Sequence, residues 1–193
     1  MIYVTLTPDE LAHDEEMALR RNEQKRRRGI QRNGTYDGKP SIDVMHLEGN
    51  HADRAVAKLI GATVDERDYP AGQRLGNLIL PNGTRAISRY RKLQDWIFGL
   101  KSTNEEDFFG LFGFLVHYGR GQNVLCVRSW IARFEFLEHA YVGNFGHGDH
   151  LVIDHAWMHP IETWPTLVPQ PSPPQPEPPS RPEPAPRPQM ALL

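Results

Sequence analysis

GNHADRAVAKLIG, residues 49–61, carries the clearest helical pattern in this chain. Its apolar residues recur at helical spacing with charged residues between them, namely Ala52, Ala55, Val56, Leu59 and Ile60. Gly61 stands where the end of a helix favours glycine. The pattern therefore predicts a core helix that buries one apolar face.

The N-terminal residues predict a short strand followed by a long helix. Residues 2–6 alternate β-branched and aromatic side chains, as a strand does. Thr7 and Glu10 have the spacing of a capping box, and Pro8 takes the first helical position. Few helix-breaking residues follow before Gly29, and acidic residues precede basic ones, as the helix dipole favours. Because this helix has few apolar positions, we expect its second half to project into solvent or onto a partner.

Further apolar runs predict strands after the core helix. Residues 78–80 and 85–87 flank an Asn-Gly turn and indicate a β-hairpin. The other expected extended segments are residues 42–44, 96–98, 151–153 and a second antiparallel pair, 108–118 with 124–136. Asp154 is expected to cap a one-turn helix that ends near Pro160. The resulting fold is α+β: a long N-terminal helix, then a core helix packed on a mixed or antiparallel sheet of about five strands.

Composition limits the class of protein. The chain has 193 residues and a net charge of −2, so overall charge indicates neither a general polyanion binder nor an acidic disordered chain. No apolar stretch reaches the roughly 20 residues that span a bilayer, so we expect a cytoplasmic protein without membrane contact. Cys126 is the only cysteine, which excludes an internal disulfide, and its apolar surroundings predict a buried, inert thiol.

The C-terminal segment has a different composition from the rest. Twelve of the 17 prolines lie between Pro165 and Pro188. This composition predicts a disordered tail, residues 165–193, that favours polyproline II. The remaining chain divides into residues 1–41, with the long charged helix, and an α+β core domain, residues 42–164. The tail is either a semi-rigid spacer or solubilising extension, or a segment that docks into an aromatic groove on a partner.

Four segments together suggest a family. They are IYVTLTPDELAH (residues 2–13), GNHADRAVAKLIG, the step from Arg74 to Leu78, and LVIDHAWMHPI (residues 151–161). In this order they resemble a group of small proteins encoded by tailed bacteriophages, which look like diverged relatives of the restriction-endonuclease-like, or PD-(D/E)XK, nucleases. The resemblance covers about residues 1–161 and omits the proline-rich tail.

The resemblance implies an active site that this chain only partly matches. Such nucleases hold Mg²⁺ with a carboxylate on the first core helix, an Asp entering the hairpin and an acid-x-Lys on the next strand. Asp53 matches the helix carboxylate. However, Arg74 stands where the hairpin Asp is expected, and acid-x-Lys is absent from the hairpin. We therefore expect an incomplete site without a cofactor. Substitute carboxylates could come from Glu48, Asp65, Glu66 or Asp68, and a Mg²⁺-dependent nuclease would have to use Asp53 with Glu66 or Asp68.

Two groups of basic residues predict a nucleic-acid-binding surface. The first is a run near the end of the long helix, and the second lies on or after the hairpin: Lys25, Arg26, Arg27 and Arg28, then Arg89, Arg91 and Lys92. Cations on such surfaces neutralise phosphates without reading sequence. The alternative explanation is a helix end adapted to its dipole and an ordinary exposed strand.

A group of histidines allows two interpretations. Five histidines gather near the end of the core: His139, His147, His150, His155 and His159. They either bind a metal such as zinc or, as we favour, have structural roles.

For the whole protein we keep three hypotheses, in this order. The first is a nuclease-like protein that binds nucleic acid or a nucleic-acid-handling partner. The second is an interaction or inhibitor module that acts on a host or virion protein through the N-terminal helix or the tail, and the third is an active nuclease.

Overall fold

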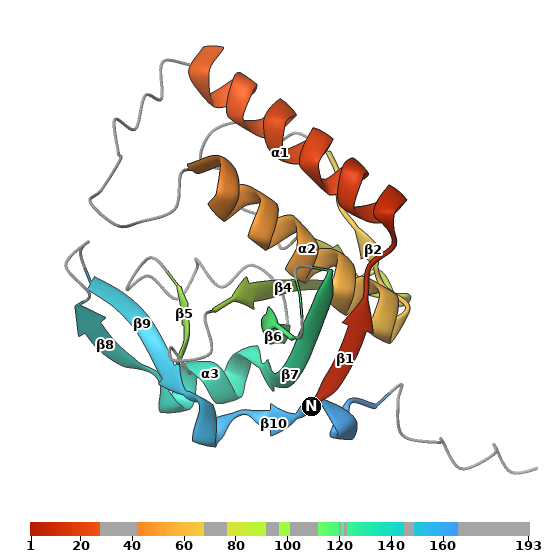
Figure 1. The fold of residues 1–193 in the computed structure, drawn as a ribbon. Helices are drawn as coiled ribbons and strands as arrows, with labels where there is room; N and C mark the ends of the chain where they lie inside the picture. Colours follow the sequence, from red (N-terminus) through yellow and green to blue (C-terminus); the bar gives the residue numbers. More distant parts are fainter. Residues whose placement is uncertain are drawn as a thin grey trace, which may run out of the picture.

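The computed structural model describes residues 1–27, 42–67, 77–91, 97–100, 112–119, 121, 123–144 and 149–165 (Figure 1). These residues form an α+β fold, as the sequence predicts. Its helices are α1 (Pro8–Arg27), α2 (Ile42–Ile60) and the short α3 (Arg133–His139). No described helix is long and apolar enough to span a bilayer. Of the predicted tail, all but Pro165 lies outside the described residues.

The main sheet is mixed and has the order β1-β7-β6-β4-β3-β2. Only β4 and β6 pair in parallel; the remaining described pairs are antiparallel, and β10 also pairs with β7. The strands are β1 (Ile2–Thr5), β2 (Thr63–Val64), β3 (Leu78–Ile79), β4 (Arg85–Tyr90), β6 (Phe112–Tyr118), β7 (Val124–Ala132) and β10 (His159–Pro160).

A second, smaller sheet has the order β5-β9-β8 and is antiparallel. Its strands are β5 (Ile97–Leu100), β8 (Tyr141–Asn144) and β9 (Asp149–Asp154). The chain then makes the single-turn helices η2 (His155–Trp157) and η3 (Ile161–Thr163), on either side of β10. This second sheet was not foreseen, because its strands come from separate parts of the chain.

The two faces of the main sheet are covered by different layers. Helix α2 packs on one face, where Ala52, Ala55 and Val56 are fully buried among side chains of β3, β4, β6 and β7. Helix α3 and the second sheet cover the other face, where Phe98, Phe136 and Ile153 form a separate core (Figure 1). Alternate residues of β4 therefore enter different cores: Ala86 faces α2, and Ile87 faces the second sheet.

The long N-terminal helix begins as its sequence suggests, but the expectation that its second half projects into solvent is wrong in part, because Ala18 and Asn22 are buried and Arg21 donates to Asn50 of α2. The backbone N–H of Thr7 donates to Glu10 Oε2 at 2.7 Å, and the Glu10 N–H donates to Thr7 Oγ1 at 3.2 Å. This reciprocal pair is the predicted capping box, which satisfies donors at the helix N-terminus. Helix α1 lies along α2, on the side of α2 remote from the sheet (Figure 1).

The predicted core helix and hairpin are confirmed, and the core helix is longer than expected. Gly61 follows α2 with a φ of 72°, and Gly83 occupies the β3–β4 turn with a φ of 81°, both in the left-handed region that favours glycine. The expectation of an extended segment at residues 42–44 is wrong, because α2 already begins at Ile42. No proline interrupts residues 42–60, so the helix continues through them.

Two expectations near the end of the core are also wrong. The run 124–136 is not one strand: β7 ends at Ala132 and α3 begins at Arg133, with Glu135 Oε2 accepting a hydrogen bond from the Ala132 N–H at 3.0 Å. A single-turn helix does follow Asp154, but that side chain does not cap it. Instead the Asp154 carboxylate accepts a hydrogen bond from the Tyr141 hydroxyl at 3.2 Å.

Candidate functional site

Asp53 lies in the interface between α2 and the β3–β4 hairpin. Its side chain is only 2% exposed. Ser88 Oγ, in β4, donates to Asp53 Oδ1 at 2.6 Å, and Asn77 Nδ2, just before β3, donates to Oδ2 at 2.8 Å. Both carboxylate oxygens thus accept hydrogen bonds from neutral groups. The arrangement ties the core helix to the hairpin, because a buried carboxylate requires such partners.

The environment of Asp53 shifts its titration. Burial raises the pKa of this carboxyl above its usual range, while the hydrogen bonds from Ser88 and Asn77 act in the opposite direction. The charges of Arg21 and Arg89 also lower it, by less. Because the net direction is upward, the folded protein favours the protonated form of Asp53 more than the unfolded chain does.

This shift predicts a pH dependence of stability. A carboxyl whose pKa is raised in the folded state contributes stability below its unfolded pKa, and this contribution is lost as pH rises through the folded pKa. As the pH rises from about 4, the free energy of unfolding of the wild type should therefore fall relative to that of Asp53→Asn. Urea unfolding of both proteins across this range measures the difference. Glu138→Gln, at an exposed carboxylate, controls for the charge change, and parallel curves for wild type and Asp53→Asn would contradict the prediction.

A second buried carboxylate, Asp14, joins α1 to α2. It is 1% exposed, and its Oδ1 accepts from Arg54 Nε at 2.7 Å. Asn50 Nδ2 donates to the Asp14 backbone carbonyl at 2.9 Å, and Arg21 in turn donates to Asn50 Oδ1. Burial raises the pKa of Asp14, the Arg54 guanidinium opposes this, and the charge of nearby Asp53 adds to the rise. The two helices are therefore joined by a polar network that adjoins Asp53.

Glu66 and Asp53 have different partners. Glu66 Oε1 lies 2.8 Å from His13 Nε2 and 3.5 Å from Arg54 NH2, and the Glu66 backbone carbonyl accepts from Arg20 at 2.9 Å. These contacts place Glu66 at the α1–α2 junction. Burial alone would raise the pKa of its carboxyl, but the hydrogen bonds and charges of His13 and Arg54 together hold that pKa below its usual range. Asp68, the third residue proposed for a metal site, lies outside the described residues, as does Arg74.

The carboxylate of Asp65, one of the possible substitute metal ligands, accepts hydrogen bonds from two arginines. It accepts from Arg85 NH2 at 2.7 Å and from Arg67 Nε at 2.8 Å. Asp65 is 5% exposed, whereas much of the Arg67 side chain is in solvent. The pair with Arg85 joins the segment after α2 to the beginning of β4, so this carboxylate supports the edge of the sheet.

A histidine and two tyrosines lie beside the Asp53 region. His51 Nδ1 is 3.3 Å from the Tyr118 hydroxyl, and the rings of Tyr118 and Tyr90 meet edge to face at 4.9 Å. Burial lowers the pKa of His51, and burial together with the Glu48 charge raises the pKa of Tyr118 to about 12. All three groups are therefore neutral near pH 7. His51 Nε2 is buried and has no hydrogen-bond partner among the described residues.

The predicted basic residues are only partly described. Arg27, at the end of α1, pairs with Glu23 one turn earlier. On β4, Arg89 Nε donates to the Gly99 carbonyl of β5 at 3.1 Å, and just after it Arg91 donates to the Tyr90 carbonyl at 3.1 Å. Arg28 and Lys92, and the side chains of Lys25 and Arg26, lie outside the described residues. Arg89 and Arg91 are thus half-buried and bonded to backbone carbonyls, and their contact with nucleic acid stays a prediction.

The described histidines near the C-terminal end of the core have aromatic and carboxylate partners. His139 stacks on Trp157 with ring centres 4.1 Å apart, and His159 Nε2 lies 2.7 Å from Glu135 Oε1. Within the described ranges, no three His, Cys, Asp or Glu side chains are grouped so as to hold a metal ion. His147 lies outside those ranges.

Cys126 lies in β7 and is buried, as its apolar surroundings predict. Burial raises the pKa of the thiol, while the charges of the N-terminus and Arg128 oppose the rise. Since the thiolate is the reactive form, this position disfavours nucleophilic chemistry.

Sequence reasoning identified Asp53 but missed its partners. Ser88 shares a face of β4 with Ala86, and this alternation was a usable signal once the hairpin had been placed. Asn77 directly precedes β3 and was not distinguishable from other loop residues. Asp14 was seen only as one of several acidic residues in the first half of the long helix.

No protein-family model matches this chain, and no curated protein similar to it was found. The resemblance to phage nuclease-like proteins therefore rests on the quoted sequence segments, and what it implies is taken up below as a proposal.

Proposed function

We propose that this protein is a nuclease-like binding protein, phage-type in origin, that contacts nucleic acid or a nucleic-acid-handling partner without cleaving it. The observation that carries the proposal is the environment of Asp53. Its carboxylate is buried, and both oxygens accept hydrogen bonds from Ser88 and Asn77. The carboxylate that the resemblance assigns to metal binding thus has a structural role in this fold.

Three chain positions support the link to a restriction-endonuclease-like fold. Asp53 of the core helix is contacted by Asn77, at the entrance to the hairpin, and by Ser88, in the second hairpin strand. In the nucleases that the chain resembles, ligands for Mg²⁺ come from corresponding elements. Here the two groups that meet Asp53 are neutral, and Arg74, which the resemblance sets at the place of the hairpin Asp, lies outside the described residues. Mg²⁺ usually requires carboxylate oxygens that remain open to it. A binding function without hydrolysis is consistent with this exchange.

The end of α1 supports contact with phosphates. Arg27 is exposed there, and the sequence places Lys25, Arg26 and Arg28 beside it. Arg27 has Glu23 as a partner, but an exposed pair of this kind contributes little and exchanges readily with other anions. Cations concentrated at one end of a projecting helix suit a phosphate backbone and give binding without sequence preference.

We expect labelled duplex or single-stranded DNA to be retained by the protein at low salt and not cleaved with Mg²⁺, Mn²⁺ or EDTA. If four cations each neutralise a phosphate of the duplex, affinity should fall roughly 100-fold between about 50 and 200 mM salt. Lys25→Glu with Arg27→Glu should abolish retention. Filter retention and gel analysis of the same samples measure binding and cleavage together.

The matched control is Arg181→Glu with Arg187→Glu, which makes the same change in net charge within the proline-rich tail. It should retain DNA far better than the helix variant. Equal losses in the two variants would show that net charge, not the end of α1, determines binding. Metal-dependent cleavage that disappears in Asp53→Ala would overturn the proposal in favour of an active nuclease.

A protein partner for α1 is the second candidate, and the side chains of the helix favour it specifically. Leu19 is 58% exposed. Arg20 and Arg21 do not extend freely into solvent but donate to the Glu66 carbonyl and to Asn50. The surface of α1 around Arg20 and Arg21 is therefore less basic than the sequence suggests. A complex that survives both nuclease treatment and high salt, and that Leu19→Asp weakens, would support this candidate.

A further inference from the structure

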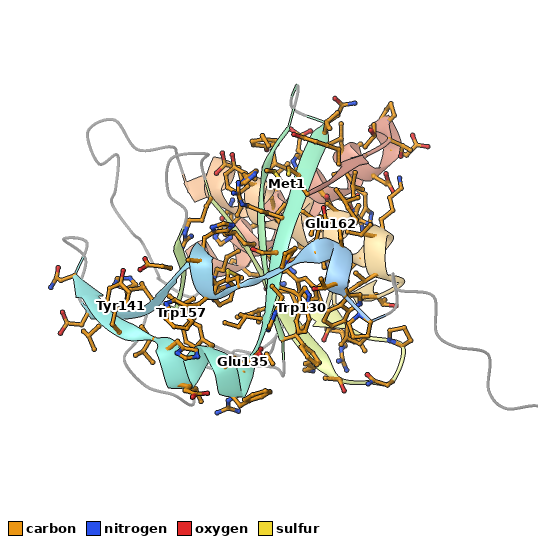
Figure 2. The ribbon with its side chains drawn as sticks, turned by 90° about the horizontal axis from the view of Figure 1, so that it is seen from below. Met1, Trp130, Glu135, Tyr141, Trp157 and Glu162 are labelled. Carbon is orange, nitrogen blue, oxygen red and sulfur yellow. The ribbon has the colours of Figure 1, made fainter. Side chains whose placement is uncertain are left out.

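One face of the protein displays aromatic and apolar side chains to solvent. It lies where α3, β8 and η2 meet, and we call it the aromatic face; its members are His139, Tyr141 and Trp157 (Figure 2). Trp157 is 55% exposed and Tyr141 45%. The Trp157 ring lies nearly parallel to His139, at an interplanar angle of 14°, so one side of the indole is supported and the other is accessible. Grouped exposed apolar side chains commonly mark a binding surface.

Aromatic contacts continue from this face to the point where the proline-rich segment begins. Trp130 packs against His159 with ring centres 4.6 Å apart and against Trp164 at 5.2 Å. Trp130 Nε1 also donates to Thr163 Oγ1 at 3.1 Å. Figure 2 shows Tyr141, Trp157 and Trp130 spread across this side of the molecule, along the segment from η2 to η3.

The start of the proline-rich segment is held in place. The Met1 amino group pairs with Glu162 in η3 (Figure 2), Trp164 is buried, and Pro165 is exposed immediately after it. The segment therefore leaves the folded part beside Trp130, at one end of the aromatic contacts. From there, 24 residues in polyproline II could extend about 75 Å. This exceeds the diameter expected for a domain of this size, whose radius of gyration is about 15 Å.

Charge distinguishes between possible occupants of this face. Exposed carboxylates lie on α3 and β9, namely Glu138, Asp149 and Asp154, and Asp154 accepts a hydrogen bond from the Tyr141 hydroxyl. The described cationic or titratable neighbours on the same elements are Arg133, His139, His150 and His155. The proline-rich segment carries Glu177, Arg181, Glu183 and Arg187, so it is neutral overall, and both arginines lie in its last part, RPEPAPRP. The exposed carboxylates favour such a neutral segment, which offers arginines, over a nucleic acid, whose phosphates they would repel.

We propose that the proline-rich segment, residues 165–188, docks in cis on the aromatic face, with prolines against Trp157 and Tyr141 and an arginine beside the exposed carboxylates of α3 and β9. Aromatic side chains suit this ligand because a polyproline II helix is already extended and loses little entropy on binding. Tethering adds a millimolar effective concentration, so even a weak contact is populated. The proposal is independent of the nucleic-acid function proposed above.

Paramagnetic relaxation in the full chain tests the docking. A nitroxide attached at Ala185→Cys is selective, because the native Cys126 thiol is buried. In ¹⁵N-labelled protein we expect the Trp157 indole and Tyr141 backbone signals to lose about half of their intensity or more, since a contact whose Kd lies below an effective concentration of about 1 mM is populated most of the time. Signals from α1 should be unaffected. Trp157→Ala should restore the Tyr141 signal, whereas Leu19→Ala, an equally exposed position on α1, should not.

The remaining outcomes would overturn the proposal. Uniform or absent broadening would mean that the segment does not prefer this face. Broadening that appears when unlabelled spin-carrying protein is mixed with ¹⁵N-labelled protein without the nitroxide would show docking between copies. Replacement of Pro173, Pro174, Pro176, Pro178 and Pro179 by serine keeps the chain length, and unchanged broadening in that variant would exclude recognition of the prolines.

Discussion

Arg54→Ala is expected to lower the free energy of unfolding by about 3–5 kcal/mol, because it leaves the buried Asp14 carboxylate without its charged partner. Arg54 Nε lies 2.7 Å from Asp14 Oδ1, and the two side chains are 19% and 1% exposed. Removing one member of such a pair costs much more than the pair itself contributes. Urea unfolding at pH 7, followed by circular dichroism, measures the loss.

Replacing both members provides the matched comparison. Asp14→Leu with Arg54→Met removes the charges while keeping similar volume, so it should cost far less than Arg54→Ala alone. The Arg54 contact with Glu66 is lost in both proteins and so cancels from the comparison. A loss below about 1 kcal/mol for Arg54→Ala, or equal losses in the two proteins, would mean that α1 does not depend on this pair.

Phe98→Ala is expected to destabilise the protein by about 3–5 kcal/mol, because its ring fills the space between the two sheets. Phe98 is fully buried in β5 and meets Phe136 of α3 edge to face at 5.6 Å. A methyl group at Gly113 in β6 would clash with Phe98 Cζ, so the ring occupies the place of a side chain there. Thermal or urea unfolding measures the effect.

Phe134→Ala is the control, since it removes the same side chain from an exposed position of α3. It should change stability by no more than about 0.5 kcal/mol. Gly113→Ala tests the same contact from the other side and should cost about 1–3 kcal/mol by overpacking. Similar effects for Phe98→Ala and Phe134→Ala would show that the second sheet does not rest on the Phe98 ring.

Strong local signals allowed much of the fold to be predicted. The Thr7–Glu10 capping box and the Asn82-Gly83 turn act within a few residues of themselves, and both are confirmed. The segment after β7 gave a misleading signal, because Phe134 and Phe136 are two residues apart and fit strand alternation, whereas in the helix they lie on different sides, Phe134 exposed and Phe136 buried. There the packing of Phe136 against Phe98, together with the Glu135 contact to Ala132, favours the helix.

The local sequence could not predict which layer covers the basic residues of β4. Arg89 and Arg91 fall on the face of β4 that the second sheet covers, and Arg89 donates to the Gly99 carbonyl there. Alternation along a strand shows that two residues share a face. It does not show which layer covers that face, since this depends on β5, β8 and β9 coming together from distant parts of the chain.

The sequence by itself determined the α+β class, the two long helices, the hairpin and Asp53 as the carboxylate of the core helix. These follow from helical periodicity, capping and turn chemistry, which act over a few residues. The tertiary structure alone decided what Asp53 touches. Its partners Asn77 and Ser88 are 24 and 35 residues away along the chain, and they meet it only because α2 packs across the hairpin in one register. The same packing makes the carboxylate that the resemblance aligns with a metal ligand a buried hydrogen-bond acceptor.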